Sequence, residues 1–284
     1  TDRTRRRIFN TMSGKLYVVG TPIGNLEDFS PRAVRTLSEA DFIAAEDTRV
    51  TLKLLNHFEI KKEMLSYYEH NKNSKGNVII ERILKGESCA LVSDAGMPAI
   101  SDPGEDLVRL AHENGITVES VPGPSALITA LAISGMESGR FCFEGFLSVN
   151  KISRRRHLED IKNEKRTMIF YEAPHKLPAT LNDMLEALGD RKITLVRELT
   201  KIHETVKNTT LKEAAEYYGE NTPRGEFVLI IEGKKEENGT VYTVNDAVAI
   251  ANKLISEGSS TSAAAKEAAQ VTGFKKSDIY RALI

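Results

Sequence analysis

Cysteine is scarce in this chain of 284 residues, with only Cys89 and Cys142 present, each inside an apolar run. Two such cysteines provide neither a disulfide framework nor a CxxC motif. The six histidines occur without HxxxH or HExxH spacing, so nothing in their positions indicates a zinc centre. We therefore predict a reduced, cytoplasmic protein without a bound metal.

Long hydrophobic runs are also missing. The longest apolar stretches, 126–133 and 227–231, are far shorter than the roughly 18 to 20 residues that a membrane-spanning helix needs. We therefore predict no membrane segment and no membrane partner.

An excess of basic residues is absent as well, since the formal net charge is −1 at pH 7. A dedicated nucleic-acid binder is usually basic over at least one domain, so any RNA contact has to depend on local patches. Three basic clusters are present: Arg3 with Arg5 to Arg7, Lys151 with Arg154 to Arg156, and Lys275 with Lys276. The first precedes Met12, and we interpret residues 1–14 as a leader or a disordered arm.

The chain does contain a repeated pattern of a short apolar run, a turn and a helix-like segment. The apolar runs 16–19, 42–45, 89–92 and 118–121 each precede a turn. Strands that alternate with helices predict a largely parallel sheet covered on both faces. A second α/β series follows, with strands expected at 141–146, 168–171, 193–197 and 227–231.

These patterns predict the domain organisation. We expect an N-terminal α/β domain at 15–125, a C-terminal α/β domain at 126–236 and a helix-turn-helix-like tail at 240–284. The charged, glycine-containing stretch between the second domain and the tail is typical of a linker.

Three loops rich in glycine and proline follow predicted strand ends, at 20–25, 93–104 and 121–126. In an open α/β sheet, ligands bind beyond the carboxyl ends of the strands. One such loop alone is typical of an ordinary connection, but three together favour a ligand site. None fits GxGxxG or GxxxxGK, so the loops do not support a nicotinamide cofactor or a nucleoside triphosphate.

Seven blocks of sequence between residues 16 and 233 carry a family resemblance. They are LYVVGTPIGNLEDFSPRAVRTLSEADFIAAEDTR, LVSDAGMPAISDPG, VPGPSALITALAISG, FCFEGFL, FYEAPHKL, RELTKIHET and PRGEFVLIIEG. In this order they resemble the bacterial 16S ribosomal RNA (cytidine-2′-O)-methyltransferases of the tetrapyrrole-methylase superfamily. The first and second loops depart from the GxGPGD and GDP patterns of the tetrapyrrole enzymes, which favours the RNA branch. Met97 stands where many relatives have threonine.

The resemblance implies two α/β domains of the tetrapyrrole-methylase type with a cofactor cleft between them, and a homodimer. It implies S-adenosyl-L-methionine as cofactor, with S-adenosyl-L-homocysteine as product, and the ribose 2′-hydroxyl of a cytidine in 16S rRNA of the small ribosomal subunit as acceptor. The cofactor residues that it implies are Pro22, Ile23, Asp94, Ala95, Gly96, Met97, Pro98, Ala99, Ile100, Ser125, Ala126, Tyr171, Glu172, Ala173, Gly225 and Glu226.

A ribose hydroxyl is a poor nucleophile, so a general base would assist its methylation. Glu46, Asp47 and His70 are the candidates, because they follow predicted strands on the cofactor side of the sheet. The alternatives are a helix cap or a surface ion pair for the two acids and a structural role for the histidine.

Arg49 and the stretch Lys151, Arg154, Arg155 and Arg156 are the candidates for RNA phosphate contacts, with plain surface charge as the alternative. Two other functions stay open: a methyltransferase for a small tetrapyrrole or corrin, and a non-catalytic ribosome-associated binding module. The glycine-rich loops argue against the second of these, because a pure binder has no evident use for them.

Overall fold

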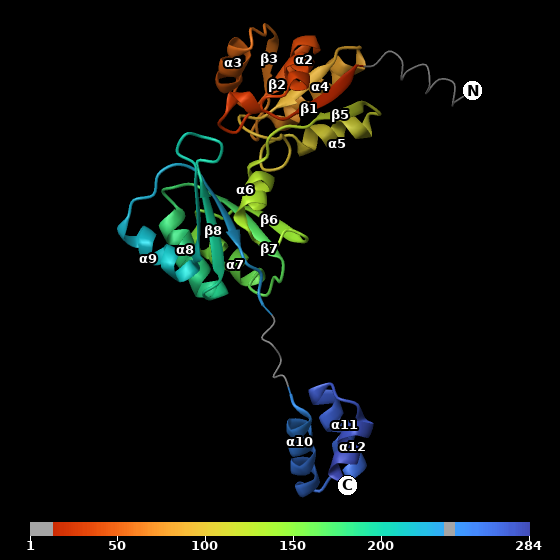
Figure 1. The fold of residues 1–284 in the computed structure, drawn as a ribbon. Helices are drawn as coiled ribbons and strands as arrows, with labels where there is room; N and C mark the ends of the chain where they lie inside the picture. The colour runs from red at the N-terminus through yellow and green to blue at the C-terminus, as the bar shows by residue number, and fades with distance from the viewer. Residues whose placement is uncertain (1–13, 236–241) are drawn as a thin grey trace, which may run out of the picture. The chain divides into compact units, whose positions relative to one another are not determined.

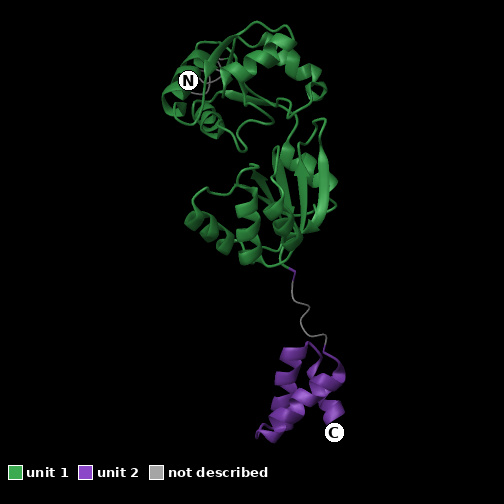
Figure 2. Ribbon diagram, turned by 90° about the vertical axis from the view of Figure 1, so that its left-hand side faces the viewer, with its two compact units in different colours: residues 1–234 green, residues 235–284 purple. Residues whose placement is uncertain are grey.

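The computed structural model describes residues 14–235 and 242–284, which form two compact units, 1–234 and 235–284 (Figure 2). The predicted leader or arm lies outside the described residues except for Gly14, as do its arginine cluster and residues 236–239 of the predicted linker. The predicted domain boundaries stay a prediction.

The first sheet of the larger unit is entirely parallel and has the strand order β3-β2-β4-β1-β5 (Figure 1). Its strands are β1 (Lys15–Val19), β2 (Phe42–Ala45), β3 (Glu63–Ser66), β4 (Cys89–Val92) and β5 (Thr117–Val121). β2 and β4 are buried along their whole length, as their continuous apolar sequences predict. The prediction of a parallel sheet is confirmed.

Helices cover both faces of this sheet because successive strand residues point in opposite directions. Phe42 and Ala44 pack with α4 (Lys72–Leu84) and α5 (Glu105–Glu113), whereas Ile43 and Ala45 pack with α2 (Pro31–Glu39) and α3 (Thr48–His57). A short 3₁₀ helix, η1 (Leu26–Asp28), follows the first loop.

The second sheet is mixed, with the order β6-β7-β10-β8-β9. β6 (Phe141–Phe146) and β7 (Thr167–Glu172) are parallel, and β8 (Lys192–Arg197), β9 (Thr205–Thr210) and β10 (Phe227–Ile231) pair antiparallel with their neighbours. Helix α6 (Ala126–Ser134) packs on one face, and α7 (Lys151–Asp160), α8 (Leu177–Leu188) and α9 (Leu211–Glu220) pack on the other.

The smaller unit consists of α10 (Val244–Ser256), α11 (Thr261–Thr272) and α12 (Lys276–Leu283). Thr243 and Asp246 form a capping box at the start of α10. Small side chains let the helices approach closely, and the core holds Ala247, Ala251, Ala264, Ala265, Ala268 and Ile279. Together with the two sheets, this helical unit agrees with the predicted fold class. Within the described residues, no helix is both long and apolar enough to cross a membrane.

Candidate active site

The three predicted loops meet at the carboxyl ends of the parallel strands. Thr21 and Gly96 exchange backbone hydrogen bonds of 2.9 and 3.1 Å, which join the first loop to the second. The Gly20 amide donates to Val121 O at 3.1 Å, which joins the first loop to the third. Gly20 and Gly123 lie so close that a Cβ on Gly20 would stand 2.7 Å from Gly123 Cα. Glycine is therefore required at this crossing.

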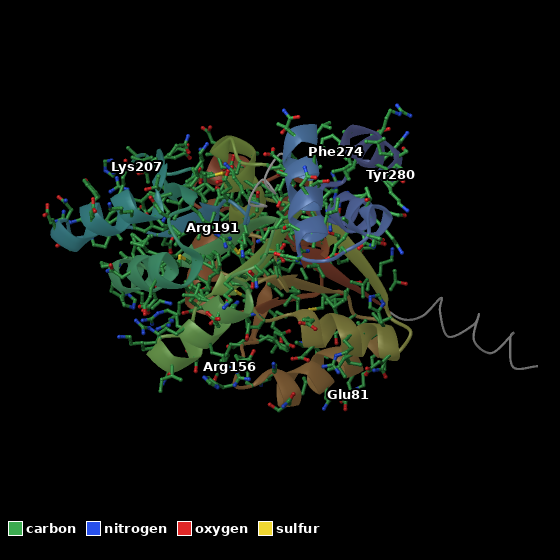
Figure 3. The ribbon with its side chains drawn as sticks, turned by 90° about the horizontal axis from the view of Figure 1, so that it is seen from below. Glu81, Arg156, Arg191, Lys207, Phe274 and Tyr280 are labelled. Atoms are coloured by element: carbon green, nitrogen blue, oxygen red, sulfur yellow. The ribbon has the colours of Figure 1, made fainter. Side chains whose placement is uncertain are left out.

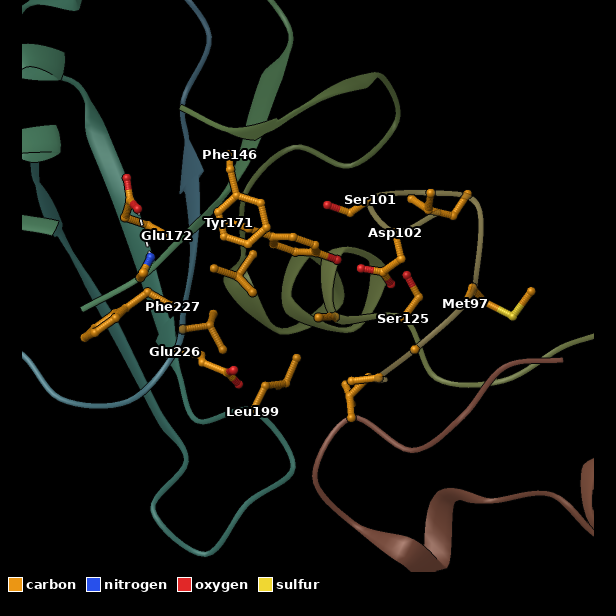
Figure 4. A pocket seen from close by; sticks show the side chains of 18 of the residues that line it. Met97, Ser101, Asp102, Ser125, Phe146, Tyr171, Glu172, Leu199, Glu226 and Phe227 are labelled. Carbon is orange, nitrogen blue, oxygen red and sulfur yellow. Dashed lines mark hydrogen bonds between the residues drawn. The ribbon is translucent and has the colours of Figure 1, made fainter. Parts of the chain in front are cut away.

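A cavity of about 340 Å³ lies where these loops face the second sheet (Figure 4). Most of the residues that were predicted to hold the cofactor line it, namely Ile23, Ala95, Gly96, Met97, Ile100, Ser125, Ala126, Tyr171, Glu172, Ala173 and Glu226. Loops of the first sheet and strand ends of the second thus contribute to one cavity, which is the arrangement that the resemblance implies.

The other predicted cofactor residues adjoin the cavity in sequence without lining it: Pro22, Asp94, Pro98, Ala99 and Gly225. Ala99 has a φ of +65°, and Gly225 a φ of +79° beside Glu198. A Cβ on Gly225 would stand 2.5 Å from Glu198 Cγ. Both residues therefore shape the backbone around the cavity.

Several lining residues were not predicted as site residues: Ser101, Asp102, Phe146, Val196, Leu199, Lys201, Phe227 and Val228. Ser101 and Asp102 belong to a loop that was predicted to bind the ligand, so their position was a usable signal. The other side chains come from the second sheet and its loops, and no local pattern marks them as site residues.

Two polar side chains at the end of β7 line the cavity, and both are hydrogen-bonded within the protein. The hydroxyl of Tyr171 accepts a hydrogen bond from the Leu127 amide at 3.0 Å, and burial raises the pKa of Tyr171. Glu172 is buried and accepts from the Ala173 amide at 2.8 Å and the Thr180 hydroxyl at 2.6 Å, and it pairs with Lys176 at 3.0 Å. Glu172 therefore fixes the chain that leaves β7.

The second sheet also contributes a charged group of residues, around the loop that follows β8. Lys201 lies 3.1 Å from Glu198 and 2.9 Å from Glu226, and the Glu226 amide donates to Glu198 at 2.9 Å. This backbone hydrogen bond, followed in importance by the contact with Lys201, lowers the pKa of Glu198. Glu198 itself has a φ of +51°. These contacts hold Glu226 and Lys201 at the rim of the cavity.

A second hollow of about 430 Å³ has Ser101 and Asp102 in common with the first cavity. Glu46 lines it, with Tyr68, Glu69, Lys72 and the start of α5. Burial, and then repulsion by Asp102, raises the pKa of Glu46. The predicted base Glu46 thus lies next to the cavity.

The other two predicted bases have different surroundings. Asp47 caps α3 and pairs with Arg49 at 2.6 Å, and these contacts, with the Arg49 side chain the largest cause, lower its pKa to about 2. His70 is exposed and lies edge-on to Tyr68, and it does not line either hollow. Asp47 therefore caps a helix, which is the alternative role that the sequence left open for it.

The predicted RNA-contact residues on α7 divide into buried and exposed side chains. Arg154 is 7% exposed, lies 2.7 Å from Asp183 and donates to Ser148 O and Val149 O. Arg155 also pairs with Asp183, at 2.9 Å. Burial alone would raise the pKa of Asp183, but the hydrogen bonds from the two arginines outweigh burial and lower it. Arg154 therefore has a structural role, and its surroundings oppose the prediction that it contacts RNA.

Lys151 and Arg156 are exposed, and within the described part of the chain neither has a carboxylate partner. Arg156 lies at the outer edge of α7 (Figure 3). Arg49 is exposed although it pairs with Asp47. These three side chains have the exposure that a phosphate contact requires.

The similarity of this chain to known proteins identifies its family. The model of the Tetrapyrrole (Corrin/Porphyrin) Methylases matches residues 15–215. A "Ribosomal RNA small subunit methyltransferase I" from Halalkalibacterium halodurans is 49% identical over 270 residues, which are 94% of this chain and 93% of that protein. The protein of the same name from Bacillus subtilis is 44% identical over 284 residues, covering 98% and 97% of the two chains.

Solved structures show the same fold at much lower identity. A diphthine synthase has a TM-score of 0.60 at 14% identity, covering 78% of this chain and 91% of that one. A uroporphyrin-III C-methyltransferase from Thermus thermophilus, complexed with S-adenosyl homocysteine, has a TM-score of 0.55 at 20% identity, covering 77% and 97%. The chain therefore belongs to the tetrapyrrole methylases, in the family of ribosomal RNA small subunit methyltransferase I.

Proposed function

We propose that this protein is an S-adenosylmethionine-dependent methyltransferase that methylates the ribose 2′-hydroxyl of a cytidine in 16S rRNA of the small ribosomal subunit. The observation that carries the proposal is the cavity in which the three loops of the first sheet face the second sheet. The relatives' names support the choice of ribosomal RNA over a small tetrapyrrole.

The cavity suits a nucleoside with a short charged chain. Its volume is within the range of about 300 to 1,000 Å³ of small-molecule sites. Gly96 lines the cavity with a φ of +87°, a conformation that favours glycine, so bare backbone forms this part of the wall. Ile100, Leu199 and Val228 provide apolar surface for a purine ring.

We propose that the predicted cofactor residues hold S-adenosylmethionine, with the eleven that line the cavity in direct contact and Pro22, Asp94, Pro98, Ala99 and Gly225 supporting the loops. When bound, this cofactor supplies an electrophilic methyl group on a sulfonium sulfur. The protein's part is to orient the acceptor hydroxyl and to exclude water.

The second hollow is the proposed entrance for the acceptor ribose, because it adjoins the cavity at Ser101 and Asp102. Of the three predicted bases, Glu46 lies closest to this route, whereas Asp47 stabilises the start of α3. For His70, which is exposed beside Tyr68, we propose a contact with the RNA near the hollow.

RNA binding is proposed for Lys151, Arg156 and Arg49, with Arg155 taking part beside its carboxylate partners. Exposed cations attract the phosphate backbone irrespective of sequence. A homodimer and a cytoplasmic location belong to the same proposal, and sedimentation of the purified protein tests the dimer.

The test is transfer of a labelled methyl group from S-adenosylmethionine to small-subunit particles or to their free RNA. We expect label in the RNA, and calorimetry should show that S-adenosylhomocysteine binds. Label in a corrin or siroheme precursor alone would support the tetrapyrrole alternative. Binding of the particles without label would support the non-catalytic module.

A further inference from the structure

The smaller unit, 235–284, lies outside the part of the chain that the family model covers, because the tetrapyrrole methylase model matches residues 15–215. A "Ribosomal RNA small subunit methyltransferase I" from Thermotoga maritima is 47% identical over 222 residues, which are the whole of that protein and 78% of this chain. The rest of this chain has no counterpart there. The smaller unit is therefore an addition to the methylase fold, which indicates a property of its own.

Cations without acidic partners are concentrated on two helices of this unit. Together with the turn between them, α11 and α12 carry four cationic and two acidic side chains, namely Lys266, Lys275, Lys276, Arg281, Glu267 and Asp278. All four cations are exposed, and within residues 14–235 and 242–284 none of them pairs with a carboxylate. By contrast, Arg82 and Arg154 of the larger unit are held by carboxylates. The cations of α11 and α12 are therefore available for an anion from outside the protein.

These side chains gather on one side of the two helices. Lys276 donates a hydrogen bond to Ser262 Oγ at 2.9 Å, which joins the start of α12 to α11. Lys266 lies one turn after Ser262, and Tyr280 lies one turn after Lys276, so each pair shares a side of its helix. Asp278 is two residues from Lys276, which is about 200° around the helix axis. The acidic side chain of α12 thus points away from this side.

Tyr280 adds an aromatic ring next to Arg281. Tyr280 is 39% exposed and lies at the surface of the unit (Figure 3). Within the described part of the chain, no aromatic ring or cation covers it, whereas Lys207 Nζ lies 3.8 Å from the centre of the exposed Tyr217 ring. An uncovered ring beside exposed cations suits single-stranded RNA, whose bases stack on aromatic side chains while cations hold the phosphates.

The helices hold this surface in a fixed shape. Ile279 of α12 is fully buried, and Phe274 and Leu283 pack against the same alanine-rich core. Gly273 ends α11 with a φ of +76°, and residues 273–275 are the whole connection to α12. Two helices joined by so short a turn form a helix-turn-helix, an arrangement in which the second helix contacts a nucleic acid.

We propose that Lys266, Lys275, Lys276, Tyr280 and Arg281 form a cationic face that binds the RNA substrate, with the cations on phosphate oxygens and the Tyr280 ring stacked on an unpaired base. This inference rests on the proposed function, which supplies the RNA. Because both units belong to one chain, RNA bound by the smaller unit raises the local concentration of the acceptor for the larger one. The cationic face therefore increases the affinity for RNA and does not take part in the methyl-transfer step.

The first experiment measures binding of the full chain to small-subunit RNA over a series of salt concentrations. Each phosphate contact contributes about 0.7 to 0.9 to the slope of log K against log salt, so the variant with Lys275→Gln, Lys276→Gln and Arg281→Gln should lose about 2 to 3 from the slope. Arg281→Gln alone should lose about 1. Lys253→Gln is its matched control, because it removes an exposed cation from α10, and it should keep the wild-type slope.

The same assay tests the aromatic ring separately from the charges. Tyr280→Ala should weaken RNA binding by about 5-fold to 150-fold, because stacking on an aromatic side chain contributes that much for one base, and it should leave the salt slope unchanged. Tyr280→Phe retains the ring and should bind as wild type does. Equal affinities for Tyr280→Ala and Tyr280→Phe would remove the ring from the RNA surface.

Single-turnover methyl transfer distinguishes RNA binding from chemistry. The triple variant should need about 10²-fold more RNA for half its maximal rate at 0.15 M salt, since a slope lowered by 2 to 3 corresponds to that loss of affinity relative to 1 M salt. At saturating RNA its rate should stay within a few-fold of wild type. Calorimetry should show unchanged binding of S-adenosylhomocysteine, which confirms that the larger unit is intact.

An unchanged slope and affinity for the triple variant would overturn the inference. A variant that binds free RNA as wild type does and loses only its binding to intact particles would show that the face contacts a ribosomal protein, and the inference would again be wrong. Loss of the saturating rate without loss of RNA affinity would also contradict it. A wild-type protein that shows these salt effects but transfers no methyl group refutes the proposed function and supports the cationic face.

Discussion

Replacing Gly20 with alanine tests how closely the loops have to approach. The added Cβ would lie 2.7 Å from Gly123 Cα and 2.7 Å from Met97 Sδ, whereas ordinary contacts lie at 3.4–4 Å. Met97 is able to move, but the Gly123 backbone is tied to its loop. The first and third loops therefore have to separate by roughly 1 Å, and a misplacement of that size lowers the rate of a positioned reaction by about 10²-fold.

The assay is single-turnover methyl transfer to small-subunit RNA, with calorimetric titration of S-adenosylhomocysteine in parallel. Gly139→Ala is the matched control, because a Cβ there meets no atom within 4 Å. We expect Gly20→Ala to lose about 10²-fold in rate and to bind the cofactor product more weakly, while Gly139→Ala stays at the wild-type level. Equal rates and affinities for the two variants would refute the claim that this loop crossing sets the geometry of the site.

Three further predictions follow from side chains outside the cavity. Arg154→Ala leaves Asp183 buried without its closest cation, so chemical denaturation should show a loss of about 3 to 5 kcal/mol, and a loss below 1 kcal/mol would contradict the structural role. Arg156→Ala should leave stability unchanged and reduce the slope of log K against log salt for RNA binding by about 1, and an unchanged slope would remove Arg156 from the RNA surface. The pKa of Asp47 is lowered to about 2 in the folded protein, below the unfolded value of about 3.9, so its stabilising effect is present above about pH 4 and declines as the pH falls toward 2. Urea midpoints of wild type and Asp47→Asn should accordingly converge over that range, and a constant difference between them would contradict this.

The strands that a single sequence predicts well are those whose residues are all buried. β2 and β4 are short apolar runs before polar turns, so their existence and their parallel arrangement follow from hydrophobic pattern alone. β9 was missed because Thr205–Thr210 is polar and mostly exposed, and its partner β8 holds it in place as an edge strand. No local pattern marks a strand of that kind.

The site residues also divide into those that the sequence predicts and those that it does not. The loops that end the parallel strands were found because glycine and proline mark them, and most of their residues line the cavity. Phe146 and Lys201 were missed because they belong to the second sheet and its loops, and only the tertiary fold brings them to the loops of the first sheet. Arg154 was misjudged for a different reason: it lies four residues before the buried Leu158, so both are on the inner face of α7. That helical spacing was a usable signal for its burial.

If the cavity holds the methyl donor next to a ribose hydroxyl of ribosomal RNA, the methylated nucleoside reveals the acceptor atom. The most direct measurement is mass spectrometry of the nucleosides released from small-subunit RNA after incubation with the protein and S-adenosylmethionine carrying an isotopically labelled methyl group. We expect labelled 2′-O-methylcytidine. Label on a base, or no labelled nucleoside in RNA that the protein demonstrably binds, would contradict it.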